Sequence, residues 1–273
     1  MSFAPVVAGS GLVAWTLLKN TMQVQTAAHA SAPDMTRDTE YFEATINSID
    51  TAEELVNDRR LLRVALGAFG LQDDLNNRYF IRKVLEEGTI DDDALANKLT
   101  DTRYKDMSAA FGFGNAATPL SKLSDFGPRI SEKFRRQQFE VAVGEQDQSL
   151  RLALNAERAL GDLAATSGSE DTKWLKIMGN APLREVFETA LGLPASFSQL
   201  DIDLQLEILK DRAEDQFGDT GIDQFAEPDV TEKLIQRFLL RAQVEEIQAA
   251  SSANIAVNLL QSAADFARTQ YRL

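Results

Sequence analysis

The sequence LLRVALGAFGL at residues 61–71 is matched by LREVFETALGL at residues 183–193. Each stretch has the apolar spacing of one helix face and ends near a glycine, a residue that tolerates the left-handed turn after a helix. The repeat predicts two related helical units and structural roles for its glycines at helix C-termini. The identical pairs lie at a constant offset of 122 residues and include Leu61 and Leu183, Val64 and Val186, Ala68 and Ala190, and Gly70 and Gly192.

Helix signals dominate the rest of the chain. Thr51 and Glu54 have the spacing of a capping box, and no segment shows the alternation of a strand beside a hairpin turn. We therefore predict an all-α protein: a multi-helical body with two divergent helical units, plus helical N- and C-terminal segments. Its expected parts are an N-terminal helical segment (1–37), a duplicated all-helical domain (38–245) with units at about 38–127 and 170–245 joined by helices in 128–169, and a C-terminal helical segment (246–273).

The composition excludes several classes of function. Lys and Arg total 28 against 42 Asp and Glu, so the net charge of −14 repels phosphate backbones and anionic membrane surfaces. The densest basic cluster is Lys133, Arg135 and Arg136, which we interpret as a solvated helix face. The chain has no cysteine, which excludes disulfides, thiolate chemistry and a cysteine-ligated metal. We expect no nucleic-acid partner.

The N-terminal stretch from Phe3 to Leu18 is apolar but carries no targeting signal. No Lys or Arg precedes it, so we expect no cleavable signal peptide. It is too short, and too broken by Pro5, Gly9 and Gly11, to span a membrane. We expect it to bury its apolar face on protein, without membrane insertion.

No motif predicts a catalytic, cofactor or metal site. His29 is the one histidine, which leaves no two-histidine metal site, and nothing near it in sequence suggests a catalytic relay. The acidic run Asp91–Asp93 is interpreted as helix capping rather than as a cation site. Gly112-Phe113-Gly114 lacks the third glycine and the following Lys-Ser/Thr of a phosphate loop. We expect the protein to work without catalytic residues, cofactor or metal.

Both ends of the chain carry apolar residues at heptad spacing. The two helices either dock on the body or on each other, or they form a coiled-coil-like surface for assembly with a partner or a second copy. We expect these residues to form buried helical surfaces while the body folds without them. The candidate interface residues are Val13, Leu17, Val24, Ala249, Ala253, Ala256, Leu260, Ala263 and Ala267.

Several phrases, in order, resemble one known family. YFEATINSIDTAEELVNDRRLLRVALGAFGLQDD, DTRYKDMSAAFGF, FEVAVGEQDQSLRLAL and LREVFETALGLP are similar to the domain of unknown function 1217 family of alphaproteobacteria, over roughly residues 38–245. The family has no established activity and no catalytic residues to transfer. Its members tend to be encoded among flagellar genes, so the resemblance implies a role linked to the flagellum, in the cytoplasm or on the flagellum itself. Axial flagellar proteins also carry terminal heptad helices, which the ends of this chain resemble.

Two functions from different classes follow. The leading prediction is a non-enzymatic structural or assembly factor of the bacterial flagellum, which docks to protein partners through its terminal helices and acidic surface. The alternative is a cytosolic enzyme or small-ligand-binding protein with its pocket between the two units. A deep cleft with convergent polar groups favours the alternative. An apolar patch on the terminal helices favours assembly.

Overall fold

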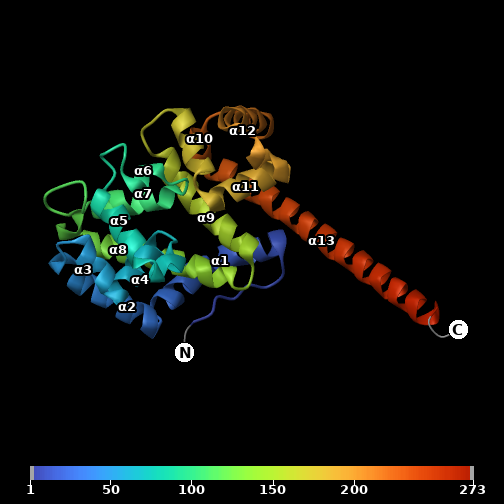
Figure 1. The fold of residues 1–273 in the computed structure, drawn as a ribbon, viewed down its shortest axis with the longest axis horizontal. Coiled ribbons are helices and arrows are strands. Elements are labelled where there is room, and N and C mark those ends of the chain that lie inside the picture. Colours follow the sequence, from blue (N-terminus) through green and yellow to red (C-terminus); the bar gives the residue numbers. More distant parts are fainter. Residues whose placement is uncertain (1–2, 271–273) are drawn as a thin grey trace.

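A computed structural model describes the backbone of residues 3–270 and the side chains of residues 3–249. Over these residues the chain forms thirteen α-helices, joined by loops and 3-10 turns, without a strand (Figure 1), which confirms the predicted all-α class. The α-helices are α1 (Gly11–Ala30), α2 (Pro33–Thr45), α3 (Ala52–Asn57), α4 (Arg59–Ala68), α5 (Arg78–Glu87), α6 (Leu95–Lys98), α7 (Thr102–Phe111), α8 (Phe126–Gly144), α9 (Gln148–Ala164), α10 (Glu170–Met178), α11 (Ala181–Leu191), α12 (Ile202–Phe217) and α13 (Pro228–Gln270). The 3-10 helices are η1 (Ile46–Ser48), η2 (Gln72–Asn76), η3 (Leu120–Lys122), η4 (Ala195–Gln199) and η5 (Ile222–Ala226).

The body contains two hydrophobic cores. One is built by α2 to α7 with the first half of α8, and the other by α1, the second half of α8 and α9 to α13. Helix α8 runs through both, since Phe134 packs in the first core and Phe139 in the second. Helix α1 closes the second core by burying Trp15, whose indole Nε1 donates to Glu232 Oε1 on α13 at 3.0 Å. The N-terminal helix thus packs against the C-terminal unit.

The two repeated stretches are helices α4 and α11, and both begin in the same way. The Asp58 carboxylate accepts a hydrogen bond from the amide of Leu61 at 3.1 Å. The Asn180 side chain accepts one from the amide of Leu183 at 3.2 Å. Both are N-caps, which satisfy backbone donors that a first helical turn leaves unpaired. The repeat thus extends three residues beyond the matched letters.

The ends of α4 and α11 also correspond. Gly70 has φ of 71° and Gly192 has φ of 69°, which confirms that both glycines occupy the left-handed region after a helix. In each case the amide after the glycine donates to the carbonyl five positions earlier, at 2.9 Å. The glycine amide donates to the carbonyl three positions earlier, which completes a Schellman motif.

The elements along the chain around the two repeated helices follow the same order, but the two helices pack on different neighbours. A helix precedes each of them, and a 3-10 turn and a further helix follow: α3, η2 and α5 in the first unit, and α10, η4 and α12 in the second. Val64 and Val186 are both fully buried. Helix α4 packs mainly on α8 and α2, however, whereas α11 packs mainly on α13 and α9. Superposition of the two units stays a prediction.

Helix α13 is 43 residues long and leaves the body part-way along its length (Figure 1). Its first turns bury Leu234, Ile235, Phe238 and Leu239 in the second core. None of the described side chains from 240 to 249 is buried. The C-terminal segment expected at 246–273 is the distal part of this one helix as far as Gln270. Within the described residues, no helix combines the length and apolar character that crossing a membrane requires.

The expectation that the terminal seams are buried is wrong for the described residues of this chain. Val13, Leu17 and Val24 are 72%, 39% and 75% exposed. Helix α1 instead turns Trp15 and its neighbours toward the core, because burying the indole removes the largest apolar area from water. Ala249 is exposed as well. The other predicted seam residues lie outside the described side chains: Ala253, Ala256, Leu260, Ala263 and Ala267.

Candidate functional site

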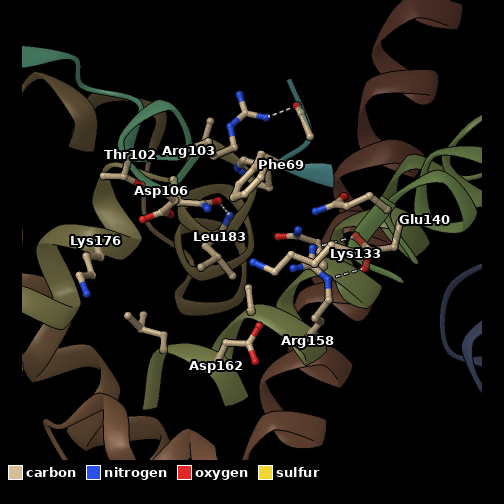
Figure 2. Close-up of a pocket in the computed structure, with 18 of the residues that line it drawn as sticks. Phe69, Thr102, Arg103, Asp106, Lys133, Glu140, Arg158, Asp162, Lys176 and Leu183 are labelled. Carbon is tan, nitrogen blue, oxygen red and sulfur yellow. Dashed lines mark hydrogen bonds and ion pairs between the residues drawn. The ribbon is translucent and has the colours of Figure 1, made fainter. Parts of the chain in front are cut away.

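A cleft of about 740 Å³ lies between the two units (Figure 2). The end of α4 and helices α7 and α8 line it from the first unit, and α9, α10 and the start of α11 line it from the second. The lining includes the apolar side chains of Phe69, Leu152 and Leu183, and each of them is less than a tenth exposed. Its volume falls within the range of sites for small organic ligands. Polar groups from several helices converge on this apolar surface.

Two ion pairs brace the cleft walls. Arg158 on α9 donates to both carboxylate oxygens of Glu140 on α8, at 2.7 and 3.1 Å, and Glu140 is only 3% exposed. Burial lowers the pKa of the Arg158 guanidinium, but the hydrogen bond and charge of Glu140 more than offset this, so the pKa lies above its ordinary value. The guanidinium is therefore charged, and its two hydrogen bonds to Glu140 fix α8 to α9.

The second pair lies at the start of α7, and its arginine also bonds the backbone at the end of α4. Arg103 donates from Nε and Nη2 to the Asp101 carboxylate at 3.0 and 2.6 Å, and Nη1 donates to the Gly70 carbonyl at 2.6 Å. Asp101 also accepts from the amide of Arg103 as the N-cap of α7. The left-handed Gly70 thus presents its carbonyl to the cleft wall.

Other charged groups line the cleft without an ion pair among the described residues. On the first unit, Asp106 lies on α7 and Lys133 on α8, with the Lys133 Nζ 5.0 Å from the centre of the Phe69 ring. Burial raises the pKa of Asp106, although Lys176, Lys133 and Lys105 act in the opposite direction. The remaining charged groups without an ion pair are Arg151, Asp162, Lys176 and Glu185.

One residue of the cleft has an acceptor without a donor. The Oδ1 atom of Asn155, on α9, is buried and receives no hydrogen bond within the described structure. A buried polar atom without a partner carries a desolvation cost of about 1–3 kcal/mol. Because the atom has no exposed surface, it is not open to a ligand in the cleft. Asn180, by contrast, lies at the cleft edge with its side-chain oxygen already bonded to the α11 backbone.

Some of the residues singled out from the sequence line this cleft, and others do not. Gly70 lines it and Gly192 does not. Lys133 and Arg136 are exposed, as predicted for a solvated helix face, and Lys133 also lines the cleft, whereas Arg135 pairs with Glu43 at 3.4 Å. His29 is 8% exposed, with its ring 5.8 Å from that of Phe139, and burial lowers its pKa despite the opposing charge of Asp34. Among the described residues no group of three His, Asp or Glu side chains is placed to hold a metal ion.

Comparison with known proteins identifies the family. The family described as a protein of unknown function, DUF1217, matches residues 68–231, which is more than half of the chain. The chain belongs to the DUF1217 family. Its fold is similar to the crystal structure of protein AGR_C_984 from Agrobacterium tumefaciens, with a TM-score of 0.72 and 25% identity over 89% of this chain and 99% of that chain. No curated protein matches the chain.

The family match includes the charged residues of the cleft and leaves out the terminal segments that carry the candidate interface. All nine charged cleft residues, from Arg103 to Glu185, lie inside the family range of 68–231. Helix α1 and the part of α13 that leaves the body lie outside it. The alternative function expected from the sequence put a pocket between the two units, but sequence reasoning named none of its residues as a site, because the charged ones come from five helices. The one local signal was Lys133 in the basic cluster.

Proposed function

We propose that this protein is a non-enzymatic structural or assembly factor that acts by protein–protein docking, with α13 as its docking element. The observation that carries this proposal is an apolar stripe on the part of α13 beyond the body. Leu240, Val244 and Ile247 are 50%, 52% and 59% exposed. Their spacing of four and three places them on one helix face, as in the seam of a helix pair.

A second face of α13 also supports docking through this helix. At 3.6 residues per turn, Ala249 lies about 180° around the helix from Leu240, in line with Ile235 and Ala242. Ile235 is fully buried in the second core, and Ala242 packs against that core. The face that the body covers therefore continues into solvent at Ala249. Because helices draw most of their stability from packing, a helix extended this far from its core is suited to a partner.

The flagellar context comes from the sequence resemblance. It supports a partner among flagellar components and a location in the cytoplasm or at the flagellum. The net charge of −14 favours basic partner surfaces. The exposed apolar side chains of α13 favour an apolar partner surface along that helix. Self-association through the same helix is the other form that docking can take.

The test combines motility with direct binding. In the source bacterium, a strain lacking the gene is complemented with wild type, with Val244→Glu plus Ile247→Glu, with Ala249→Glu, or with Ile90→Glu. Ile90 is the matched control, because it is 73% exposed on the body. We expect loss of motility, and loss of co-purification with isolated flagellar basal structures, for at least one α13 variant and not for Ile90→Glu. Wild-type behaviour of all α13 variants would refute docking through this helix.

The cleft supports a second candidate function, binding of a small ligand. The observation that favours it is the convergence of charged side chains from five helices on a cavity of suitable size. This candidate is independent of α13, because the cleft residues lie on α4 and α7 to α11. Saturable binding of a small molecule, lost on substitution of a cleft residue, is its test.

A further inference from the structure

The two units share few contacts besides helix α8. Each has its own hydrophobic core, and α8 contributes Phe134 to the first and Phe139 to the second. The residues between them, Arg135 to Gln138, are polar, and none is buried. Within the described part of the chain, no helix from α2 to α7 packs extensively on any helix from α9 to α13. The relative position of the units therefore depends on α8, on the junction of α1 with α2, and on contacts at the edges of the cleft.

One such contact joins α7 to the end of α10. The amide of Thr102, the first residue of α7, donates to the carbonyl of Gly179 at 3.0 Å. Among the residues that the structure describes, no other residue pair joins 33–125 to 146–249 by a hydrogen bond or an ion pair. Thr102 lines the cleft, on the same side as Lys176 of α10 (Figure 2). The contact therefore closes one edge of the cleft.

Glycine at position 179 permits this close approach. Its φ of −84° is one that any residue adopts, so the backbone conformation does not require glycine. A Cβ atom built there would lie 2.6 Å from the Thr102 Cγ2 atom and 2.9 Å from the Thr100 carbonyl oxygen. Any side chain at this position would therefore push the start of α7 away from the end of α10.

We propose that the cleft opens and closes by a small movement of one unit against the other, and that the Thr102–Gly179 contact is the latch that holds it closed. The movement is a bend of α8 between Arg135 and Gln138, where the helix is buried in neither core. Long helices curve without losing their hydrogen bonds, and domain closure around a cleft is a common conformational change. This inference requires neither docking through α13 nor a particular ligand.

Two substitutions break the latch in different ways. Thr102→Pro removes the donor amide. Proline is favoured at the first position of a helix, and Asp101 before it already has the extended conformation (φ −79°, ψ 107°) that a residue preceding proline needs, so α7 should still form. Gly179→Ala instead places a Cβ atom against the start of α7. The matched controls are Thr102→Val, which keeps the amide, and Gly161→Ala, whose Cβ atom meets nothing within 4 Å.

The measurement is a distance between two spin labels by pulsed electron paramagnetic resonance. The full chain has no cysteine, so labels attach only at the introduced Tyr79→Cys on α5 and Arg212→Cys on α12, both exposed positions. Helix α5 packs on α7 and α12 packs on α10, so the labels follow the two sides of the latch.

We expect one narrow distance distribution for the protein with an intact latch and for both controls. Each latch variant should add a second population at longer distance. Its ratio of open to closed molecules should rise about fivefold or more, because loss of one hydrogen bond shifts an equilibrium by about this factor.

Thr102→Pro decides the proposal if circular dichroism shows it folded, and Gly179→Ala decides it otherwise. An unchanged narrow distance in the deciding variant would overturn the latch. A broad distribution in the protein with an intact latch would overturn it as well, and so would a longer distance in Thr102→Val or Gly161→Ala, because the contact would then not be what holds the cleft closed.

Discussion

Replacement of Gly70 by alanine tests the structural role of the repeated glycine. Gly70 has φ of 71°, and a Cβ atom built there lies 3.4 Å from its nearest neighbour, the Arg103 Nη1 atom. That separation is ordinary van der Waals contact, so the substitution perturbs the backbone and little else. Gly161 supplies the matched control, because it lies within α9, and a Cβ atom there meets nothing within 4 Å.

The magnitude follows from two opposing terms. An L-residue in the left-handed region costs about 1–2 kcal/mol. The reduced freedom of alanine in the unfolded chain offsets about 0.4–1 kcal/mol of this cost. We expect Gly70→Ala to lower the free energy of unfolding by about 1 kcal/mol. Gly161→Ala benefits from the unfolded-state term without the backbone penalty, so it should raise stability by about 0.5–1 kcal/mol.

The assay is urea unfolding followed by circular dichroism, with thermal melting as a second probe. A change of 1 kcal/mol shifts the melting temperature of a chain of this size by about 2–4 °C, so the two variants should move in opposite directions. Gly192→Ala should destabilise at least as much as Gly70→Ala, since Gly192 has φ of 69° in the same motif and a Cβ atom there also displaces the Arg241 guanidinium. If Gly70→Ala proved as stable as Gly161→Ala, the left-handed role of the repeated glycine would be wrong.

Three further predictions concern other parts of the body. Arg158→Met should destabilise by roughly 3–5 kcal/mol in urea unfolding, because it leaves the buried Glu140 carboxylate without its partner, and the double variant with Glu140→Leu should recover much of the loss. Thr51→Ala removes the side-chain half of the α3 capping box and should cost about 1 kcal/mol by the same measurement, with no loss refuting the cap. Burial holds the pKa of His29 below its ordinary value of 6.5, so the unfolded chain takes up a proton before the folded one does. Stability from this group is complete above about pH 6.5 and is lost as pH falls below it, and His29→Phe should flatten the slope of melting temperature between pH 7 and 5.

Local signals were read correctly from the sequence because their partners are close along the chain. The capping box of Thr51 and Glu54 and the left-handed Gly70 and Gly192 each depend on residues within one or two helical turns. The order of helices around each repeated stretch follows from the same signals. The all-α class was therefore accessible before any packing was known.

The face of α1 was misjudged for a physical reason. Heptad counting selected Val13, Leu17 and Val24, but α1 also carries Trp15 and Leu18. A helix with apolar residues on two sides has no single apolar stripe, so spacing alone does not decide which side the body covers. The buried side contains Trp15, which gains more from burial and finds Glu232 as a partner for its indole N–H.

The residues that line the cleft escaped prediction because long-range packing brings them together. Lys133, Arg158 and Asp106 come from three helices, and nothing in their spacing records which of them meet. The exposed stripe of α13 is different. Leu240, Val244 and Ile247 were visible in the sequence, but their role depends on where the body ends along the helix. That position is set by the packing of α13 on α1, α9 and α11.

Helix α11 connects the two candidate sites. Its first turn, from Asn180 to Leu183, forms part of the cleft, and its later turns pack on the buried part of α13. The N-cap at Asn180 and the left-handed Gly192 fix both ends of this helix. Interactions that stabilise the first turn of α11 therefore also stabilise the surface on which α13 rests. Helix α11 is therefore the element that links the cleft to the base of the projecting helix.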